Sequence, residues 1–348
     1  MSPFRVGLIG AGGISRTYMA AMRQVAEGRV VAVWSRTRER AQAFAKDFEL
    51  SLATTEIAPL LDAVDVVCVN SPNACHAEHT IAAAEAGCHV IVEKPLAVSL
   101  EEGEAMIDAC RRAGVGLAYA EELPFVPRFR RARKLLAAGE LGEPIYVTQR
   151  EAHAGPYSPW FFSREEAGGG VMMDMACHSI ECVRWLLGKP DVLRVTAHLN
   201  RTVHAERTPL EDHAVVHLVF ASGVSATCEA SWALQGGMQS TLEVWGSSGY
   251  LDVDLLQATG LRQYAKGTWS TPLSEPLPEN GYPQELSHFL CCFAEGREPD
   301  ESGADGLVVL EILYAAYASA REGRSIDLPF RPEGIERAVD LWLGAPNP

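Results

Sequence analysis

Short runs rich in Val, Ile and Leu alternate with amphipathic stretches over the first third of the chain. The runs have the length and composition of buried strands and lie at residues 5–9, 30–34, 64–69, 88–94 and 115–119. Apolar residues at helical spacing follow between them, up to residue 22, near 56–61, at 76–86 and at 100–113. Strands separated by such helices are joined by right-handed crossovers. Residues 1–121 are therefore predicted to form a Rossmann domain with a doubly wound parallel sheet.

The pattern changes after residue 121. A proline-punctuated stretch at 121–127 precedes a basic amphipathic helix at 128–138, and a further strand opens at 144. From residue 192 the apolar positions alternate with period two, at 195–203, 213–220, 224–232, 240–245 and 250–255. This alternation, with glycine-bearing turns between the runs, predicts a large and mostly antiparallel sheet.

Helical spacing returns near the end of the chain. Helices are expected at 283–294 and 306–321, followed by a short extended run at 326–329 and a surface helix and tail at 332–348. Residues 122–348 are therefore predicted to form one α+β domain with an open sheet.

The composition is that of an ordinary globular protein with an excess of acid. The 348 residues are 47% hydrophobic and carry a formal net charge of -15. A protein with this net charge lacks the excess of basic residues that attracts phosphate groups, so neither nucleic acid nor a membrane is an expected partner. Without a signal sequence or a membrane-length apolar run, a cytoplasmic location is expected. The nine cysteines are scattered and lack a Cys-x-x-Cys pair, which disfavours a disulfide framework and a structural zinc site.

The predicted strand at 88–94 ends in two charged residues. Glu93 and Lys94 are followed by Pro95, which cannot continue a strand. Ligands of open parallel sheets bind outside the carboxyl ends of the strands, so Lys94 is well placed for chemistry. A solvated lysine in a simple turn would leave the same pattern, and the motifs below favour the functional interpretation.

A glycine-rich turn follows the first predicted strand. Gly10, Gly12 and Gly13 lead into a helical pattern that begins near Ile14. Glycines at such a turn let the backbone approach a pyrophosphate, whose charge then meets free N–H groups and the positive end of the helix. Ser15 stands where the dinucleotide fingerprint has glycine or alanine, and it is small enough for close packing of helix and strand.

The second predicted strand ends at Ser35 and Arg36, and no acid follows until Glu39. A site specific for NAD usually places an acid here to bind the ribose 2′-hydroxyl. A serine hydroxyl and a guanidinium, which forms forked pairs with phosphate, suit a 2′-phosphate instead. NADP(H) is therefore favoured and NAD(H) remains possible; Arg36 could also be an ordinary solvated charge.

Three motifs occur in order at the predicted strand ends: the turn at 10–14, Ser71-Pro72-Asn73 with His76, and Glu93-Lys94-Pro95. In these motifs the chain resembles the glucose-fructose oxidoreductase, inositol dehydrogenase and rhizopine-catabolism (Gfo/Idh/MocA) family, over nearly its whole length. The resemblance implies that Ser71, Asn73, His76, Glu93 and Lys94 line the dinucleotide site and that Lys94 is catalytic. His76 is expected to begin or cap the following helix rather than touch substrate.

A second constellation combines glycines at 168–170 with Asp174 and His178. Residues four apart share one face of a helix, and the glycines would let the chain pass close to a ligand. Histidine with a neighbouring acid suits general acid/base catalysis, although the spacing also fits a buried histidine held by an aspartate. The resemblance implies a catalytic triad of Lys94, Asp174 and His178 around the substrate. Whether Lys94 or His178 is the base stays open.

Aromatic rings, hydroxyls, proline and glycine gather at residues 151–162, as suits a loop that binds a sugar. The candidate substrate residues outside the triad are Glu121, Arg150, His153, Tyr157 and Trp160. Glu121 could contact substrate or brace the junction between domains, and Phe161 and Phe162 are expected in the core. No third ligand lies at a convincing spacing from His153 and His178, so no metal is expected.

These features predict hydride transfer between NAD(P) and a secondary alcohol or ketone of a sugar, sugar derivative or inositol. One alternative is a redox-neutral lyase, epimerase or glycosidase that retains its NAD(H). Another is a sensor without activity, which the presence of Lys94, Asp174 and His178 disfavours. Members of the family pair through the open sheet, so the resemblance implies a homodimer or homotetramer.

Overall fold

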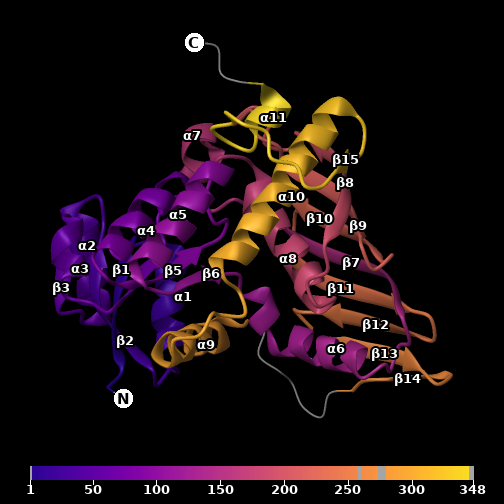
Figure 1. Cartoon of the computed structure of the whole chain (residues 1–348), viewed down its shortest axis with the longest axis horizontal. Coiled ribbons are helices and arrows are strands. Elements are labelled where there is room, and N and C mark those ends of the chain that lie inside the picture. The colour runs from indigo at the N-terminus through magenta and orange to yellow at the C-terminus, as the bar shows by residue number, and fades with distance from the viewer. Residues whose placement is uncertain (1, 258–259, 273–279, 345–348) are drawn as a thin grey trace. The chain divides into compact units, whose positions relative to one another are not determined.

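The chain forms two units in the computed structural model, which describes residues 2–257, 260–272 and 280–344 (Figure 1). The first unit consists of Met1–Glu121 and Tyr282–Leu307, and the second of Glu122–Gly281 and Val308–Pro348. The segment from 282 to 307 thus joins the first unit, whereas the sequence interpretation kept residues 122–348 together. Helical spacing alone does not show on which sheet a helix packs.

A parallel sheet of six strands, in the order β3-β2-β1-β4-β5-β6, forms the centre of the first unit. Its strands are β1 (Phe4–Ile9), β2 (Gly28–Trp34), β3 (Leu52–Thr54), β4 (Val66–Val69), β5 (His89–Glu93) and β6 (Leu117–Ala120). The helices between them are α1 (Gly13–Met22), α2 (Arg38–Phe48), α3 (Ile57–Leu61), α4 (His76–Glu85) and α5 (Leu100–Ala113). The predicted doubly wound parallel sheet is confirmed.

The strand order of this sheet reverses at β1. Successive strands run outward through β2 and β3 on one side, and the chain then crosses to β4 on the other side. All four side chains of β4 are buried, as expected for a strand covered on both faces. In such sheets the ligand binds at the carboxyl ends of the strands beside the reversal, which here are the loops after β1 and β4.

The late helix α9 (Tyr282–Glu295) packs against α1, and the residues after it bond to β6. The N–H of Tyr119 donates to the carbonyl oxygen of Glu301 at 3.0 Å. Helix α10 (Gly303–Glu322) begins in this unit and continues in the second.

A sheet of nine strands forms the second unit, in the order β14-β13-β12-β11-β7-β10-β9-β8-β15. Its strands are β7 (Pro144–His153), β8 (Val192–Asn200), β9 (His213–Phe220), β10 (Ser225–Ser231), β11 (Met238–Gly246), β12 (Gly249–Asp254), β13 (Leu261–Ala265), β14 (Thr268–Ser270) and β15 (Ile326–Asp327). Neighbouring strands are antiparallel except β7 and β10, which are parallel. The predicted mostly antiparallel sheet is also confirmed.

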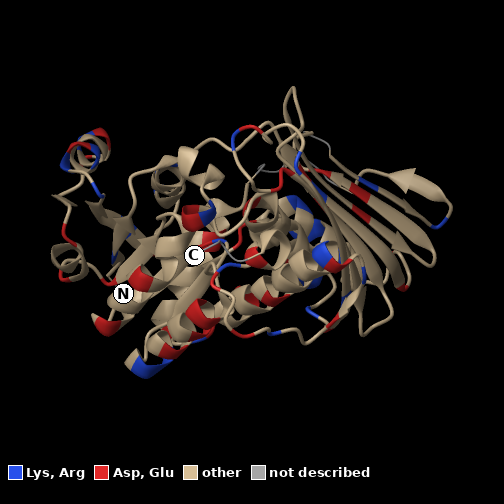
Figure 2. Ribbon diagram, turned by 90° about the horizontal axis from the view of Figure 1, so that it is seen from above, with Lys and Arg blue, Asp and Glu red and all other residues tan. Residues whose placement is uncertain are grey.

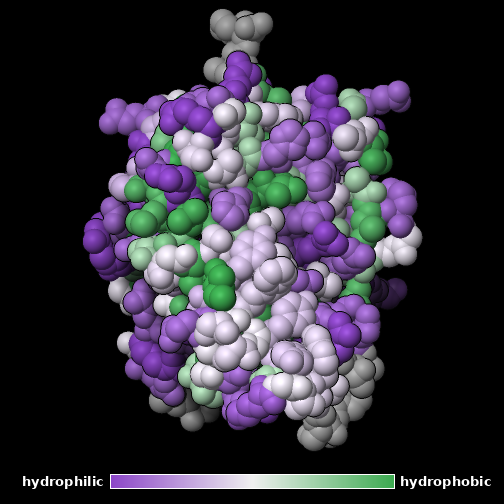
Figure 3. All heavy atoms as spheres, turned by 90° about the vertical axis from the view of Figure 1, so that its right-hand side faces the viewer, coloured by the Kyte–Doolittle hydropathy of each residue, from purple (hydrophilic) through white to green (hydrophobic). Residues whose placement is uncertain are grey.

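Helices cover one face of this sheet. The helical segments of the unit are α6 (Pro127–Ala137), α7 (Arg164–Ala167), a π-helical turn (Met172–Ala176), α8 (Cys177–Leu186), α11 (Asp340–Leu343) and 3₁₀ turns at Leu123–Phe125 and Pro159–Phe162. Helix α8 packs on β7 and β10, and α6 packs on β12. Along β9 every second side chain is buried and those between are half-buried, so the opposite face is open. Figure 3 shows this side of the molecule, where pale and hydrophobic side chains lie among hydrophilic ones.

Acidic and basic residues both occur on the helices (Figure 2), but α6 carries five basic residues and no acidic one. Within the described residues, α10 alone is long and apolar enough to cross a membrane. Its most apolar window is 72% buried, as in the core helix of a globular protein.

Candidate active site

The turn after β1 is fixed to the loop after β4. Gly10 has φ of 119°, and a Cβ atom there would lie 2.5 Å from the carbonyl oxygen of Asn70, so only glycine fits. The Ser15 hydroxyl donates to the carbonyl oxygen of Gly10 at 2.7 Å, and Nδ2 of Asn70 donates to the Ser15 hydroxyl at 3.0 Å. Ser15 thus ties the two loops together, a role that its small size alone does not reveal.

The next two glycines face open space. A Cβ atom at Gly12 or Gly13 would meet nothing within 4 Å. Gly12 caps α1 without a side-chain hydrogen bond, and no acidic residue lies in the first turn of the helix. The N–H groups and the positive end of α1 are therefore suited to an anion, and a dinucleotide pyrophosphate fits the turn at Gly12, Gly13 and Ile14.

The end of β2 presents a buried Ser35 and an exposed Arg36. Thr37 caps α2 without a side-chain hydrogen bond, and Glu39 is the only acid in the first turn of that helix. The last residue of β2 is fixed by a hydrogen bond, because Nε1 of Trp34 donates to the carbonyl oxygen of Thr55 at 2.9 Å.

Glu93 at the end of β5 is buried, Lys94 is half-buried, and the Lys94–Pro95 bond is cis. The ring of His76 joins this turn to the loop after β4. Its Nδ1 lies 2.9 Å from the carbonyl oxygen of Pro95, and its Nε2 lies 3.0 Å from that of Ser71. A neutral ring has one N–H and donates to one of these oxygens at a time.

Burial lowers the pKa of His76 to about 4, although the facing carbonyls oppose this shift. The ring is therefore neutral and braces the two turns, and the cofactor contact expected of it stays a prediction. His76 does begin α4, as the sequence suggested. Ser71 and Asn73 are buried beside it, and the Ser71 hydroxyl lies 2.9 Å from Nδ1 of His79.

Glu211 holds the backbone that leads into Asp174, at Gly170 and Met172. Oε1 of this buried carboxyl group accepts hydrogen bonds from the N–H of Gly170 at 2.9 Å, the N–H of Met172 at 3.1 Å and the Tyr317 hydroxyl at 2.7 Å. A Cβ atom at Gly169 would lie 2.1 Å from the Tyr317 hydroxyl, and one at Gly170 would lie 2.0 Å from the Glu211 carbonyl oxygen. These two glycines thus accommodate protein neighbours, whereas the sequence interpretation assigned them to a ligand.

The single α-helix expected across Asp174 and His178 is wrong over its first turn. Met172–Ala176 is π-helical, and α8 begins at Cys177. The wider π turn follows directly on the backbone held by Glu211 and changes the regular four-residue stacking. Burial raises the pKa of Glu211 to about 7, although the hydrogen bonds from Tyr317 and the backbone oppose this shift.

Asp174 is buried and bound by Trp232 from the end of β10. Nε1 of Trp232 donates to Oδ2 of Asp174 at 2.8 Å. The indole is fully buried and packs edge-on against Phe161 and Phe162, with ring centres 6.4 and 6.2 Å away. Sequence reasoning missed Trp232, whose only signal was a large aromatic residue at the end of an apolar run.

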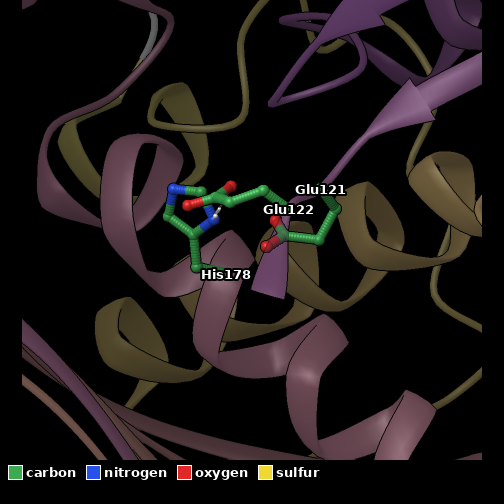
Figure 4. A group of neighbouring side chains, drawn as sticks. All are labelled: Glu121, Glu122 and His178. Carbon is green, nitrogen blue, oxygen red and sulfur yellow. Dashed lines mark ion pairs between the residues drawn. The ribbon is translucent and has the colours of Figure 1, made fainter. Parts of the chain in front are cut away.

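His178 lies on α8 beside Glu122 (Figure 4). Its Nδ1 is 3.5 Å from Oε2 of Glu122, and the side chains are only 9% and 17% exposed. Glu122 follows the fully buried Glu121 at the start of the second unit. Sequence reasoning chose Glu121 from this pair of acids and missed its neighbour.

The loop after β7 carries two stacked pairs of rings. Tyr157 is 81% exposed and stacks on the buried His153, with ring centres 5.0 Å apart and planes at 19°. Trp160 stacks on Phe161 with centres 3.8 Å apart. Phe161 and Phe162 are half-buried, so the expectation that they belong to the core is wrong. Both rings pack edge-on against Trp232 and keep part of their surface exposed.

Arg150 points away from the helices that cover β7. Its guanidinium pairs with Glu229 of β10 at 2.6 Å, and 45% of its side chain is exposed. Its neighbours Gln149 and Glu151 are buried on the opposite face, where α8 packs. Successive strand residues face opposite sides, so the structure does not bring Arg150 together with His178.

The predicted residues thus form two groups. The carboxyl edge of the first sheet carries the glycine turn, Ser35, Arg36, Ser71, Asn73, Glu93 and Lys94. The second unit holds Asp174 with Trp232, His178 with Glu122, and the aromatic loop. The first group provides a glycine turn that suits a dinucleotide. The second provides a histidine and an acid whose side chains are largely buried.

Two family models match the chain. Residues 4–121 match a model described as an oxidoreductase family with an NAD-binding Rossmann fold, and residues 129–252 match the GFO/IDH/MocA C-terminal domain.

Several proteins are similar to this chain over almost its whole length. A 1,5-anhydro-D-fructose reductase from Ensifer adhaerens is 31% identical over 93% of this chain and 98% of its own. A D-xylose 1-dehydrogenase (NADP(+)) from Haloferax volcanii is 29% identical over 92% and 99%. The crystal structure of GenD2 from gentamicin A biosynthesis, in complex with NAD, superposes with a TM-score of 0.86 at 30% identity and covers 95% of this chain and 97% of its own.

Proposed function

This chain belongs to the Gfo/Idh/MocA family of oxidoreductases, and we propose that it is an NADP(H)-dependent dehydrogenase or reductase of a sugar, sugar derivative or inositol. The observation that carries the proposal is the open glycine turn at Gly12 and Gly13, at the positive end of α1 and at the reversal of the strand order. The reductase from Ensifer adhaerens and the xylose dehydrogenase from Haloferax volcanii, each matched over 92% or more of either chain, support a CH–OH or carbonyl group as the reacting centre.

The end of β2 supports NADP(H). Arg36 is exposed there, and no carboxylate precedes Glu39 to hold a ribose 2′-hydroxyl. A guanidinium forms forked, charge-assisted hydrogen bonds with a phosphate, and the buried Ser35 supplies a hydroxyl beside it. NAD(H) remains the alternative, because the crystal structure of GenD2 was obtained with NAD.

The catalytic residues proposed are Lys94, Asp174 and His178. The bound cofactor supplies a nicotinamide ring that exchanges hydride with the substrate carbon. Lys94 donates a hydrogen bond to the substrate oxygen and stabilises its negative charge, while His178 takes up the hydroxyl proton during oxidation and returns it during reduction. Asp174, held by Trp232, stabilises positive charge on these groups.

Four further residues are proposed to recognise the substrate: Glu121, His153, Tyr157 and Trp160. The exposed face of Tyr157, supported from below by His153, suits the apolar face of a sugar ring. Arg150 is left out because its guanidinium pairs with Glu229 on the other face of the sheet. The open face of the sheet is proposed to pair two copies of the chain, in the cytoplasm.

Fluorescence titration with NADPH and NADH tests the cofactor, for the wild type, Arg36→Ala and the control Arg29→Ala. Arg29 is exposed at the opposite end of β2. We expect tighter binding of NADPH, a loss of about 10-fold or more in Arg36→Ala, and no change in the control. An equal preference in all three proteins would contradict the assignment of Arg36, and a failure to bind either nucleotide would overturn the function itself.

A further inference from the structure

The pair formed by His178 and Glu122 bears on which nitrogen of the His178 ring carries the proton. We infer that Glu122 is a positioning residue that keeps the proton of neutral His178 on Nδ1, so that Nε2 is the ring atom through which His178 acts in the proposed reaction. This inference rests on the proposed oxidoreductase function. It goes beyond that function, which already gives the proton transfer to His178, because it identifies the ring atom that acts and the residue that orients it.

The position of Glu122 is fixed by its surroundings. It is followed by the 3₁₀ turn Leu123–Phe125, whose side chains are buried and which packs on α8, the helix that carries His178. The N–H of Phe125 donates to the carbonyl oxygen of Glu122 at 2.9 Å. A Cβ atom at Gly281 would lie only 2.6 Å from that same oxygen, so the chain passes close behind it.

The turn is also held from its far side. Nε of Arg130, in α6, donates to the carbonyl oxygen of Pro124 at 3.0 Å, and the Arg130 guanidinium lies 5.0 Å from the centre of the Phe125 ring. Backbone and side chains thus fix Glu122 relative to α8, and the carboxylate is not a mobile surface group.

The chemistry of the two groups then determines the tautomer. A carboxylate only accepts hydrogen bonds, whereas a neutral imidazole donates through one nitrogen and accepts through the other. With Oε2 of Glu122 at 3.5 Å from Nδ1, the proton is favoured on Nδ1. Such contacts are often long before substrate binds and shorten in the reacting complex. Nε2 is then the nitrogen that accepts the substrate proton.

The negative charge also favours the protonated ring that forms during oxidation. Both side chains are more than four-fifths buried, so solvent screens the interaction only weakly. The O–H bond of the alcohol breaks and its proton moves to Nε2, while the C–H bond of the carbon that bears this oxygen breaks and its hydride passes to the oxidised dinucleotide, which the proposed function supplies. The products are a ketone, the reduced dinucleotide and protonated His178.

The direct test is ¹⁵N NMR of protein labelled in its ten histidines, with the His178 signal identified by its absence in His178→Gln. Spectra are compared for the wild type, Glu122→Leu, Glu122→Asp and the control Glu333→Gln, an exposed acid of the same unit. We expect the Nδ1–H form in the wild type and the control, its loss in Glu122→Leu and its partial return in Glu122→Asp. An Nε2–H form in the wild type would overturn the inference.

Kinetics provide the second readout. We expect kcat to fall about 10- to 100-fold in Glu122→Leu with KM changed less than about threefold, and to recover in part in Glu122→Asp. The acid limb of the kcat/KM profile should move to lower pH, because the carboxylate no longer favours the protonated ring. Unchanged kinetics in Glu122→Leu would contradict the inference. If no dinucleotide binds, the proposed function fails, while the NMR spectra still report separately on the pair.

Discussion

At the scale of single residues, the two side chains of the second unit that are proposed to be catalytic, Asp174 and His178, each face a partner distant in the sequence. The indole N–H of Trp232 holds the carboxylate of Asp174 at 2.8 Å, and the carboxylate of Glu122 faces His178. Such partners matter because a reacting group displaced slightly from its working geometry loses much of its effect.

Removal of the indole N–H should therefore reduce activity without destroying the fold. In Trp232→Phe a ring remains but the hydrogen bond to Asp174 is lost, which costs about 1–3 kcal/mol of stability when the partner stays buried. We expect a fall of about 10-fold in kcat and a lower Tm, measured by steady-state kinetics and calorimetry. Trp269→Phe, at an exposed position, is the control, and equal kinetics in both variants would argue against this role.

Glu211 should make stability depend on pH. Burial raises its pKa to about 7 from the usual 4.5, so the folded chain binds this proton more tightly than the unfolded chain. Its contribution is complete below about pH 4.5 and is lost as the pH rises through 7. Glu211→Gln keeps the acceptor oxygen without the charge.

We therefore expect the difference in Tm, Glu211→Gln minus wild type, to increase by about 3–5 °C as the pH is raised from 5 to 8. The measurement is differential scanning fluorimetry of both proteins across this range. A Tm difference that stays constant with pH would show that Glu211 does not titrate there.

At the scale of elements, the glycines of the chain serve different purposes that the sequence does not distinguish. Gly10 and Gly170 are required because a Cβ atom there would lie 2.5 and 2.0 Å from protein atoms, whereas Gly12 and Gly13 face open space. The latter two are thus the ones that a bound dinucleotide would explain.

Gly13→Ala separates these purposes. Alanine is the better helix former by about 0.5–1 kcal/mol, so the Tm should stay unchanged or increase. Affinity for NADPH should fall about 10-fold or more, because the methyl group occupies the space at the pyrophosphate turn. Titration and thermal melts test both parts, and unchanged affinity would place the pyrophosphate elsewhere.

The sequence predicted the elements well where the information is local. Alternation along 213–220 and the apolar run at 66–69 indicate strands because each residue's burial follows from its own strand. The π turn at Met172–Ala176 was not predictable, because it depends on Glu211 and Tyr317, which lie far away in the sequence. Trp232 was missed for the same reason, since it bonds to a residue 58 positions earlier.

At the scale of the whole molecule, the open face of the second sheet remains to be covered. Trp245, Tyr264 and Trp269 are 50%, 38% and 55% exposed on its strands. Exposed aromatic residues on one sheet face are typical of an interface, in agreement with the proposed pairing of two chains.

A charge placed on this face should separate the chains. We expect light scattering after size exclusion to give at least twice 37.7 kDa for the wild type and 37.7 kDa for Trp245→Glu. Val203→Glu, at an exposed position in the loop after β8, should keep the larger mass. A monomeric wild type would contradict the proposed assembly.

The most direct test of the central proposal is absorbance at 340 nm during incubation with NADP⁺ or NADPH and a panel of sugars, their oxidised forms and inositols. We expect a change with at least one substrate and a rate reduced about 10²- to 10⁴-fold in His178→Ala, which should still bind the dinucleotide. If the wild type binds the dinucleotide but no substrate changes the absorbance, or if His178→Ala is as fast as the wild type, the proposed hydride transfer with His178 as its base is contradicted.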